Sequence, residues 1–151
     1  MQSAAAPEAL ADSPINPSWV KEGSPVARAQ VLTQSADARM KSGVWDCTAG
    51  RFTWIFEFDE VVQILEGEVR VESNGETRVL TAGSTAFFPY GLQTQWHVPK
   101  YVKKFFTQRH PSRVVQLARR VGALLRRGMQ VAVISVAMVS LDDGLLTAAC
   151  L

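Results

Sequence analysis

The chain has 151 residues, of which 47% are hydrophobic and 20% are charged, and its formal net charge is +2. This length is enough for one domain with a sizeable core, and the composition excludes an intrinsically disordered protein. Two cysteines, Cys47 and Cys150, are too few for a disulfide framework or a cysteine-rich zinc site, so we expect a cytoplasmic protein.

The small net charge hides an uneven distribution of charged residues along the chain. Residues 1–76 contain twelve acidic and six basic residues, whereas residues 77–141 contain ten basic residues and no acidic one. A basic half can contact nucleic acid, anionic lipid or an acidic partner, or it can be a cationic surface that balances an acidic one. We expect the second, and we expect no nucleic-acid partner.

The beginning of the chain has little pattern of regular structure. Residues 1–14 are rich in small residues and proline, and they lack the basic and apolar regions of a secretory signal, so we expect a disordered leader. Residues 15–28 hold prolines among turn residues, which predicts an extended arm. A short strand over residues 29–33 and a polar loop over residues 35–43 are predicted to follow.

From residue 44 onward the pattern becomes that of β-strands. Phe52, Trp54 and Phe56 occupy every second position, which is typical of a strand with one buried face. Asn74-Gly75 is a strong signal for a tight hairpin turn. Many short strands separated by glycine and proline turns indicate an all-β sandwich or barrel. The further predicted strands cover residues 61–65, 68–72, 85–88, 93–98 and 101–107.

The last part of the chain differs from the strand-rich part. Apolar residues recur at helical spacing between arginines from Arg113 to Arg127, which predicts a basic amphipathic helix that ends near Gly128. Residues 129–141 form an apolar run that is shorter than the roughly 20 residues of a transmembrane helix. The predicted organisation is therefore a leader over residues 1–14, a β-domain over residues 15–108, and a helical and apolar tail over residues 109–151.

The spacing of a few residues in the strand-rich part resembles the two conserved motifs of the cupin superfamily. Glu60 precedes Gly67 by seven residues, as the glutamate of the first motif precedes its glycine. Gly83, Pro89 and Gly91 match the second motif. The resemblance implies a cupin fold, an RmlC-like jelly-roll β-barrel. It places the four metal-ligand positions of that fold at Trp54, Phe56, Glu60 and Thr94.

The side chains at these four positions argue against a metal cofactor. Divalent metals bind imidazole nitrogen, thiolate or carboxylate ligands, and the rings of Trp54 and Phe56 offer none of these. Thr94 is a poor substitute for histidine, and the two histidines of the chain, His97 and His110, lie elsewhere. We therefore expect neither a metal ion nor another cofactor.

The surrounding sequence narrows the resemblance to one branch of the superfamily. The segments VWDCTAGRFTWIFEFDE, QILEGEV and AGSTAFFPYGLQTQW are similar to short, single-domain bacterial cupins of the ureidoglycine-aminohydrolase-like or ethanolamine-utilisation-like group (DUF861-type). Members of this group often carry aromatic residues at the histidine positions of the first motif. The resemblance implies a homodimer with a ligand pocket at the mouth of the barrel, and it implies no particular reaction.

The strand through the first motif decides which side chains reach the barrel interior. If Trp54 and Phe56 point inward, Thr53, Ile55 and Glu57 face outward, because successive side chains of a strand alternate between its faces. Aromatic residues on the inner face can line a pocket for a small molecule or fill the barrel core. The candidate ligand-binding residues are Trp45, Trp54, Phe56, Tyr90, Trp96 and Lys104.

Glu60 is the candidate catalytic residue. A carboxylate in an aromatic cavity can act as a general acid or base, whereas a carboxylate near the rim would bond lysine, arginine or backbone amides. Lys103 and Lys104 are neighbours on a predicted strand, so one of them faces inward. An inward lysine near Glu60 would form an ion pair or a catalytic pair with it.

Three functions remain open on the sequence. The first is the binding of a small polar metabolite in an aromatic-lined barrel pocket without a metal ion. The second is an enzyme that acts on a small amine, ureide or sugar derivative, with Glu60 as its general acid or base. The third is a barrel whose basic helix, from Arg113 to Arg127, docks on an anionic membrane or on a partner. The alternative for that helix is to cover the barrel or a dimer interface.

Overall fold

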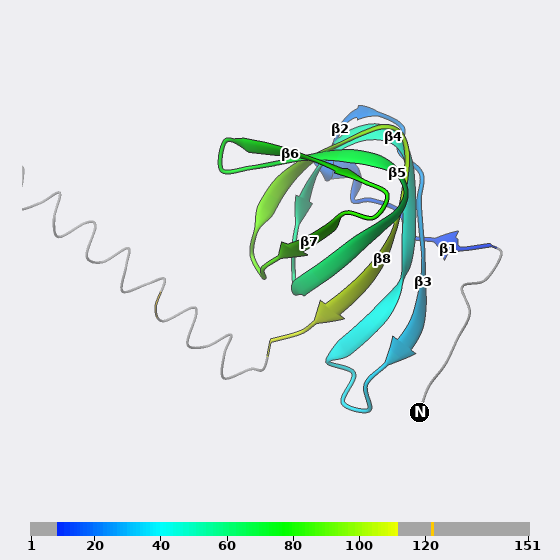
Figure 1. Ribbon diagram of the computed structural model, residues 1–151, viewed down its shortest axis with the longest axis vertical. Helices are drawn as coiled ribbons and strands as arrows, with labels where there is room; N and C mark the ends of the chain where they lie inside the picture. Colours follow the sequence, from blue (N-terminus) through cyan, green and yellow to red (C-terminus); the bar gives the residue numbers. More distant parts are fainter. Residues whose placement is uncertain (1–8, 112–121, 123–151) are drawn as a thin grey trace, which may run out of the picture. The chain divides into compact units, whose positions relative to one another are not determined.

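The computed structural model describes residues 9–111 and Gly122. Residues 9–111 form one antiparallel sheet of eight strands that curls around a core (Figure 1). This confirms the all-β class for the described residues, whereas the predicted helix and the apolar run after it lie outside them, apart from Gly122. The elements are β1 (Ala11–Asp12), the 3-10 helix η1 (Pro17–Trp19), β2 (Val20–Gly23), β3 (Ala27–Gln34), β4 (Met40–Ile55), β5 (Asp59–Ser73), β6 (Glu76–Thr81), β7 (Thr85–Phe88) and β8 (Gln93–Arg109).

Three long strands, β4, β8 and β5, lie side by side in the middle of the sheet. The strand order is β1-β3-β4-β8-β5-β6, with β2 paired to β4 and β7 paired to β5. The register shifts between Thr48 and Gly50 in the β4–β8 ladder, and again near Gly67 in the β5–β8 ladder. Such irregularities bend a strand, so one continuous strand serves where the sequence predicted two, both in β5 and in β8.

The structure corrects the predicted leader, arm and loop at the start of the domain. Ala11 and Asp12 pair with β3 as strand β1, so these two residues of the predicted leader belong to the sheet. The predicted arm contains η1, β2 and the start of β3, and the predicted loop contains the first residues of β4. These segments gain backbone partners from distant strands, and such pairing overrides a local composition rich in turn residues.

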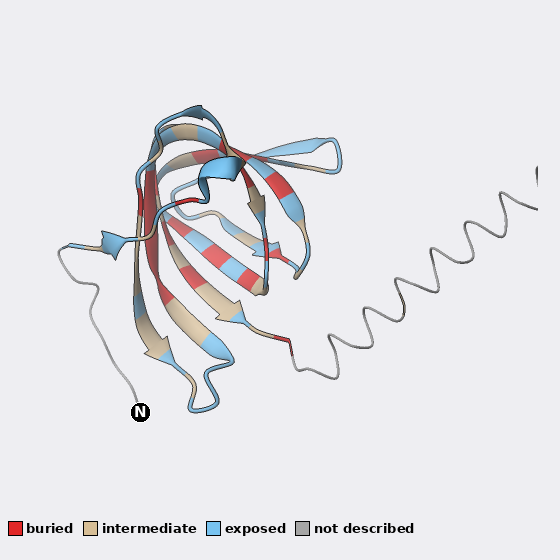
Figure 2. Ribbon diagram, turned by 180° about the vertical axis from the view of Figure 1, so that it is seen from behind, coloured by how far each residue is buried: buried red, intermediate tan, exposed pale blue. Residues whose placement is uncertain are grey.

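Burial follows the alternation of the strands, and the ribbon shows buried residues alternating with exposed or intermediate ones along several strands (Figure 2). Phe52 of β4 and Phe56, which directly follows that strand, are fully buried, whereas Ile55 and Glu57 are exposed, as predicted. Thr53 differs from the prediction because it is buried although it lies on the outward row. Gln95 on β8 is its direct partner in the β4–β8 ladder and accepts a hydrogen bond from Thr53 Oγ1 at 3.1 Å.

The N-terminal segment packs onto the core instead of extending away from it. Ile15 belongs to the buried core cluster, and Trp19 of η1 packs against that cluster. The ring of Trp19 lies edge-on to the ring of Trp54, with 5.9 Å between the ring centroids. No helix among the residues that the structure describes is long and apolar enough to span a membrane.

Candidate ligand-binding site

A buried ion pair lies in the interior of the sheet. Lys104 Nζ on β8 lies 2.7 Å from Glu60 Oε1 on β5, and the two side chains are only 4% and 1% exposed. The second carboxylate oxygen, Glu60 Oε2, accepts a hydrogen bond from Gln108 Nε2 at 3.1 Å. Glu60 and Gln108 are direct partners in the β5–β8 ladder, and Lys104 lies four residues before Gln108 on the same face of β8. Both oxygens of Glu60 are therefore engaged by the chain itself.

Three indole rings surround the ammonium group of Lys104. Its Nζ lies 4.8 Å from the ring centroid of Trp96, 4.9 Å from that of Trp45 and 5.9 Å from that of Trp54. We call these three residues the tryptophan cage. Trp45 meets both other rings edge-on, at centroid distances of 5.9 Å and 6.0 Å. Each indole face attracts a cation by about 0.5 to 2 kcal/mol, so the cage and Glu60 together stabilise the charge of Lys104.

The indole N–H groups of Trp96 and Trp45 differ in whether they have a hydrogen-bond partner. Trp96 Nε1 donates to Thr94 Oγ1 at 2.9 Å, and Thr94 Oγ1 donates in turn to the carbonyl oxygen of Trp54 at 3.2 Å. Trp45 Nε1, by contrast, is buried and has no hydrogen-bond partner. A buried N–H without a partner costs about 1 to 3 kcal/mol, which is unusual in a well-packed core.

The four metal-ligand positions implied by the sequence do not fit a metal ion. Trp54 contributes a wall of the cage, and Phe56 stacks on Phe88 with the ring centroids 4.5 Å apart. Thr94 is engaged with two tryptophans, and Glu60 is engaged with Lys104 and Gln108. Within residues 9–111, no group of three or more His, Cys, Asp or Glu side chains is arranged to hold a metal ion. A single carboxylate among aromatic rings is not a divalent-metal site.

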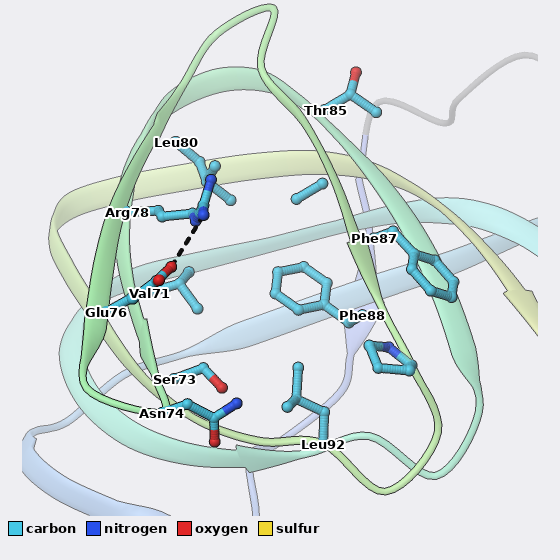
Figure 3. A pocket seen from close by; sticks show the side chains of 12 residues that line it. Val71, Ser73, Asn74, Glu76, Arg78, Leu80, Thr85, Phe87, Phe88 and Leu92 are labelled. Carbon is cyan, nitrogen blue, oxygen red and sulfur yellow. Dashed lines mark hydrogen bonds and ion pairs between the residues drawn. The ribbon is translucent and has the colours of Figure 1, made fainter.

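A cavity of about 630 Å³ opens next to this interior, between the β5–β6 hairpin and β7 (Figure 3). We call it the hairpin cavity. Its apolar part is formed by Val71, Leu80, Phe88 and Leu92. Its polar part includes Arg78 and Glu76, which pair at 3.0 Å and are both well exposed. Phe88 lines the cavity and also stacks on Phe56, so the cavity borders the aromatic interior.

Comparison with known proteins places the fold. Residues 34–106 match the family model of the EutQ-like cupin domain. This protein is a member of the cupin superfamily. The curated relatives include the acetate kinase EutQ of Salmonella typhimurium, which is 30% identical over 78 residues, or 52% of this chain and 34% of the relative. The cupin described here therefore spans about a third of the length of that relative.

Two solved structures support the same branch of the cupins. A DUF861-family protein of unknown function from Pseudomonas syringae is 25% identical, with a TM-score of 0.62 over 70% of this chain and 51% of that chain. A putative ethanolamine utilization protein, EutQ, from Salmonella typhimurium is 26% identical, with a TM-score of 0.52 over 58% of this chain and 72% of that chain. The predicted family and its branch are confirmed.

The predicted ligand-binding residues of this cupin divide into three groups. Trp45, Trp54, Trp96 and Lys104 come together as the cage and its occupant, and Phe56 packs beside them. Tyr90 lies in the turn after β7, where its backbone N–H donates to Asp59 Oδ1 at 2.9 Å. None of these six residues lines the hairpin cavity.

Sequence reasoning missed several residues that shape the site. Gln108 was not singled out, although it lies four residues after Lys104 and therefore on the same strand face. Trp19 was assigned to an extended arm, yet it packs on Trp54. Arg78 at the hairpin cavity had no signal of its own, because a cavity depends on how the β5–β6 hairpin and β7 are placed.

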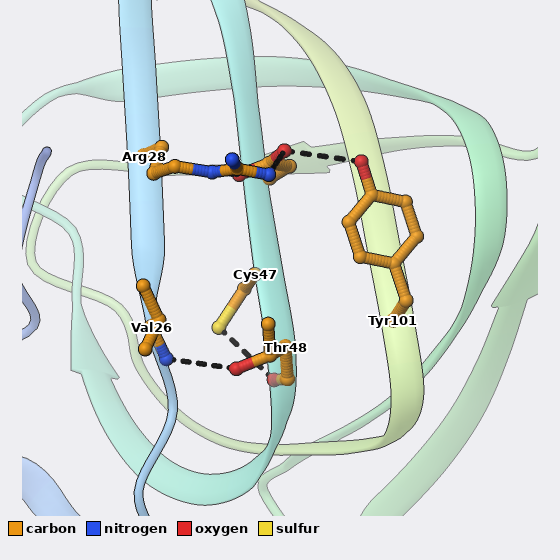
Figure 4. A network of polar contacts seen from close by, with 6 residues as sticks. Val26, Arg28, Cys47, Thr48 and Tyr101 are labelled. Carbon is orange, nitrogen blue, oxygen red and sulfur yellow. Dashed lines mark hydrogen bonds and ion pairs between the residues drawn. The ribbon is translucent and has the colours of Figure 1, made fainter. Parts of the chain in front are cut away.

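A second buried polar cluster, also missed, ties β3, β4 and β8 together (Figure 4). Asp46 accepts hydrogen bonds from Arg28 Nε at 3.0 Å and Nη2 at 2.7 Å, and from the hydroxyl of Tyr101 at 3.0 Å. The hydrogen bonds and charge of Asp46 raise the pKa of Arg28. Burial, followed by the hydrogen bond to Asp46, raises the pKa of Tyr101 to about 12.

Cys47 lies on the strand next to this cluster and behaves as a core residue. Its side chain is fully buried, and Sγ donates to the carbonyl oxygen of Thr48 at 3.3 Å. Burial, with a smaller contribution from the charge of Asp46, raises the pKa of the Cys47 thiol to about 12. The thiol therefore stays protonated at neutral pH, and Cys47 is not an activated nucleophile.

Proposed function

We propose that this cupin domain binds a small organic acid in the hairpin cavity. The observation that carries the proposal is the composition of that cavity, where one guanidinium group, that of Arg78, stands at the edge of an apolar wall. Its volume of about 630 Å³ suits a small metabolite. The sequence predicted a pocket among Trp45, Trp54 and Trp96, but these side chains pack around Lys104, so the proposed site is the cavity next to them.

Arg78 is the group that favours an acidic ligand. It pairs with Glu76, and their side chains are 77% and 72% exposed. An exposed ion pair of this kind contributes little to stability, so a ligand carboxylate can replace Glu76 at low cost. A guanidinium binds a carboxylate through two parallel hydrogen bonds. Val71, Leu80, Phe88 and Leu92 would then cover the apolar part of the ligand.

The names of the curated relatives agree with this ligand class without fixing it. The EutQ proteins of Salmonella typhimurium and Escherichia coli are named acetate kinases, and acetate is a carboxylate. This chain covers only 34% of either relative. We therefore carry over the carboxylate as a candidate ligand and not the phosphoryl transfer.

Replacing Arg78 by alanine should weaken carboxylate binding by up to about fivefold, because an exposed charge pair contributes up to about 1 kcal/mol. Binding is measured by thermal shift and calorimetry with the linear carboxylates from acetate to hexanoate and with their amides. Arg51→Ala is the matched control, since Arg51 is also exposed and paired to a glutamate, Glu22, at 3.2 Å. The proposal would be contradicted if the amides bound as tightly as the acids, or if Arg78→Ala and Arg51→Ala lost the same affinity for the carboxylates.

The other functions considered from the sequence stay predictions. Catalysis by Glu60 finds less support than binding does, because its carboxylate is 1% exposed and both oxygens accept hydrogen bonds. Docking through the helix from Arg113 to Arg127 concerns residues outside those described. The homodimer and the cytoplasmic location likewise remain expectations.

A further inference from the structure

The interior of the barrel has the chemical make-up of a site for an organic cation. One carboxylate, that of Glu60, faces three indole rings, and all four side chains reach the same ammonium group. Aromatic faces around a cation, with one anionic partner, are how proteins recognise substituted ammonium groups. Here the group is Lys104 Nζ, which belongs to the chain itself.

This cation lies beside residues at the metal-ligand positions of the cupin motifs. Glu60 holds the glutamate position of the first motif, Trp54 holds a histidine position of that motif, and Thr94 holds the histidine position of the second. Lys104 Nζ is 2.7 Å from Glu60 Oε1 and 5.9 Å from the ring centroid of Trp54. Trp54 and Thr94 are direct partners in the β4–β8 ladder. A side chain from β8 thus places positive charge beside two of these positions, Glu60 and Trp54.

We propose that the barrel interior is an ammonium-binding site that the chain fills with Lys104, in place of the metal ion of other cupins. Shortening Lys104 converts this filled site into one that binds a free primary alkylammonium ion. The ligand class follows from the surroundings, which offer one carboxylate and indole faces to a singly charged, partly apolar cation. Trp45 Nε1 and Gln108 Nε2 are donors, so they add no ligand atom for a metal.

The central experiment uses Lys104→Ala in the 151-residue chain and adds propylammonium, which replaces the side-chain atoms that the substitution removes. We expect propylammonium at about ten times its dissociation constant to raise the melting temperature of the variant by roughly 5 °C. Propanol at the same concentration should have no such effect, because it lacks the charge. The unsubstituted protein should not respond to propylammonium, because Lys104 already fills the site.

Two further variants separate the cage from general salt or solvent effects. Glu60→Gln combined with Lys104→Ala removes the counter-ion, so propylammonium should stabilise it much less than it stabilises Lys104→Ala. Lys104→Met fills the space with an uncharged side chain and should not respond at all. Stabilisation of Lys104→Ala by zinc chloride but not by propylammonium would overturn the proposal in favour of a masked metal site. No response of a folded Lys104→Ala to propylammonium would also overturn it.

A measurement on the unsubstituted chain keeps the proposal testable if Lys104→Ala does not fold. In protein labelled with ¹⁵N-lysine, the ammonium and neighbouring methylene protons of one lysine should be shifted upfield by the three indole rings. Loss of this signal in Lys104→Arg, but not in Lys103→Arg, would assign it. Ordinary shifts for every lysine would contradict the cage, since burial alone produces no ring-current shift.

Discussion

Replacing Lys104 by methionine is expected to lower the free energy of unfolding by about 3 to 5 kcal/mol, which is the usual cost of breaking a buried ion pair from one side. The substitution keeps most of the side-chain volume, so little of this loss comes from a cavity. It leaves the Glu60 carboxylate buried, with the hydrogen bond from Gln108 Nε2 but without its counter-ion. The loss is measured by urea denaturation at neutral pH.

The neighbouring lysine provides the control for this prediction. Lys103→Met removes the same charge from the same strand, but Lys103 is half-buried and lies on the opposite face from Lys104. We expect it to change the free energy of unfolding by less than about 1 kcal/mol. Glu60→Gln added to Lys104→Met should recover part of the loss, because the pair is then removed from both sides. Equal losses in the two lysine variants would contradict a specific role of the buried pair.

Replacing Gly67 by alanine is the second change with a large expected effect. Gly67 has a φ of +73°, and a Cβ there would lie 2.0 Å from the carbonyl oxygen of Tyr101. Left-handed backbone costs an alanine about 1 to 2 kcal/mol, and overpacking adds about 1 to 3 kcal/mol. We therefore expect a loss of about 2 to 5 kcal/mol in the free energy of unfolding, measured by urea denaturation.

Gly75 separates the two causes of this loss. It has a φ of +80°, close to that of Gly67, but a Cβ there would have no neighbour within 4 Å. Gly75→Ala should therefore lose only the backbone part, about 1 to 2 kcal/mol. If Gly67→Ala were no more damaging than Gly75→Ala, the close approach of β5 and β8 at Gly67 would not be what requires glycine.

Features that depend on nearby residues were predictable from the sequence. The hairpin turn at Asn74-Gly75 forms as predicted, with a φ of +53° at Asn74 and of +80° at Gly75. The motif spacing around Glu60 and Gly67 led to the correct superfamily. Strand alternation required one of Lys103 and Lys104 to face inward, and Lys104 does. Each of these inferences needs only a turn preference, a short spacing or a two-residue period.

Features that depend on register between distant strands were not predictable. The ring of Trp45 reaches Lys104 because β4 and β8 pair those two residues directly, across 59 residues of chain. Gln108 reaches Glu60 through the β5–β8 ladder in the same way. The hairpin cavity depends on how the β5–β6 hairpin stands relative to β7, which no residue pattern encodes. The predicted aromatic residues therefore come together as the cage, and the ligand-binding role predicted for them stays a prediction.

The metal content of the purified 151-residue chain tests the central claim most directly. The protein and its Glu60→Gln variant are incubated with zinc, iron, manganese or nickel, dialysed, and measured by inductively coupled plasma mass spectrometry. We propose that Lys104 takes the place of the metal ion beside Glu60. We therefore expect the unsubstituted protein and the Glu60→Gln variant to retain equal amounts of metal. One transition-metal ion per chain, present in the unsubstituted protein and lost in a folded Glu60→Gln variant, would contradict it.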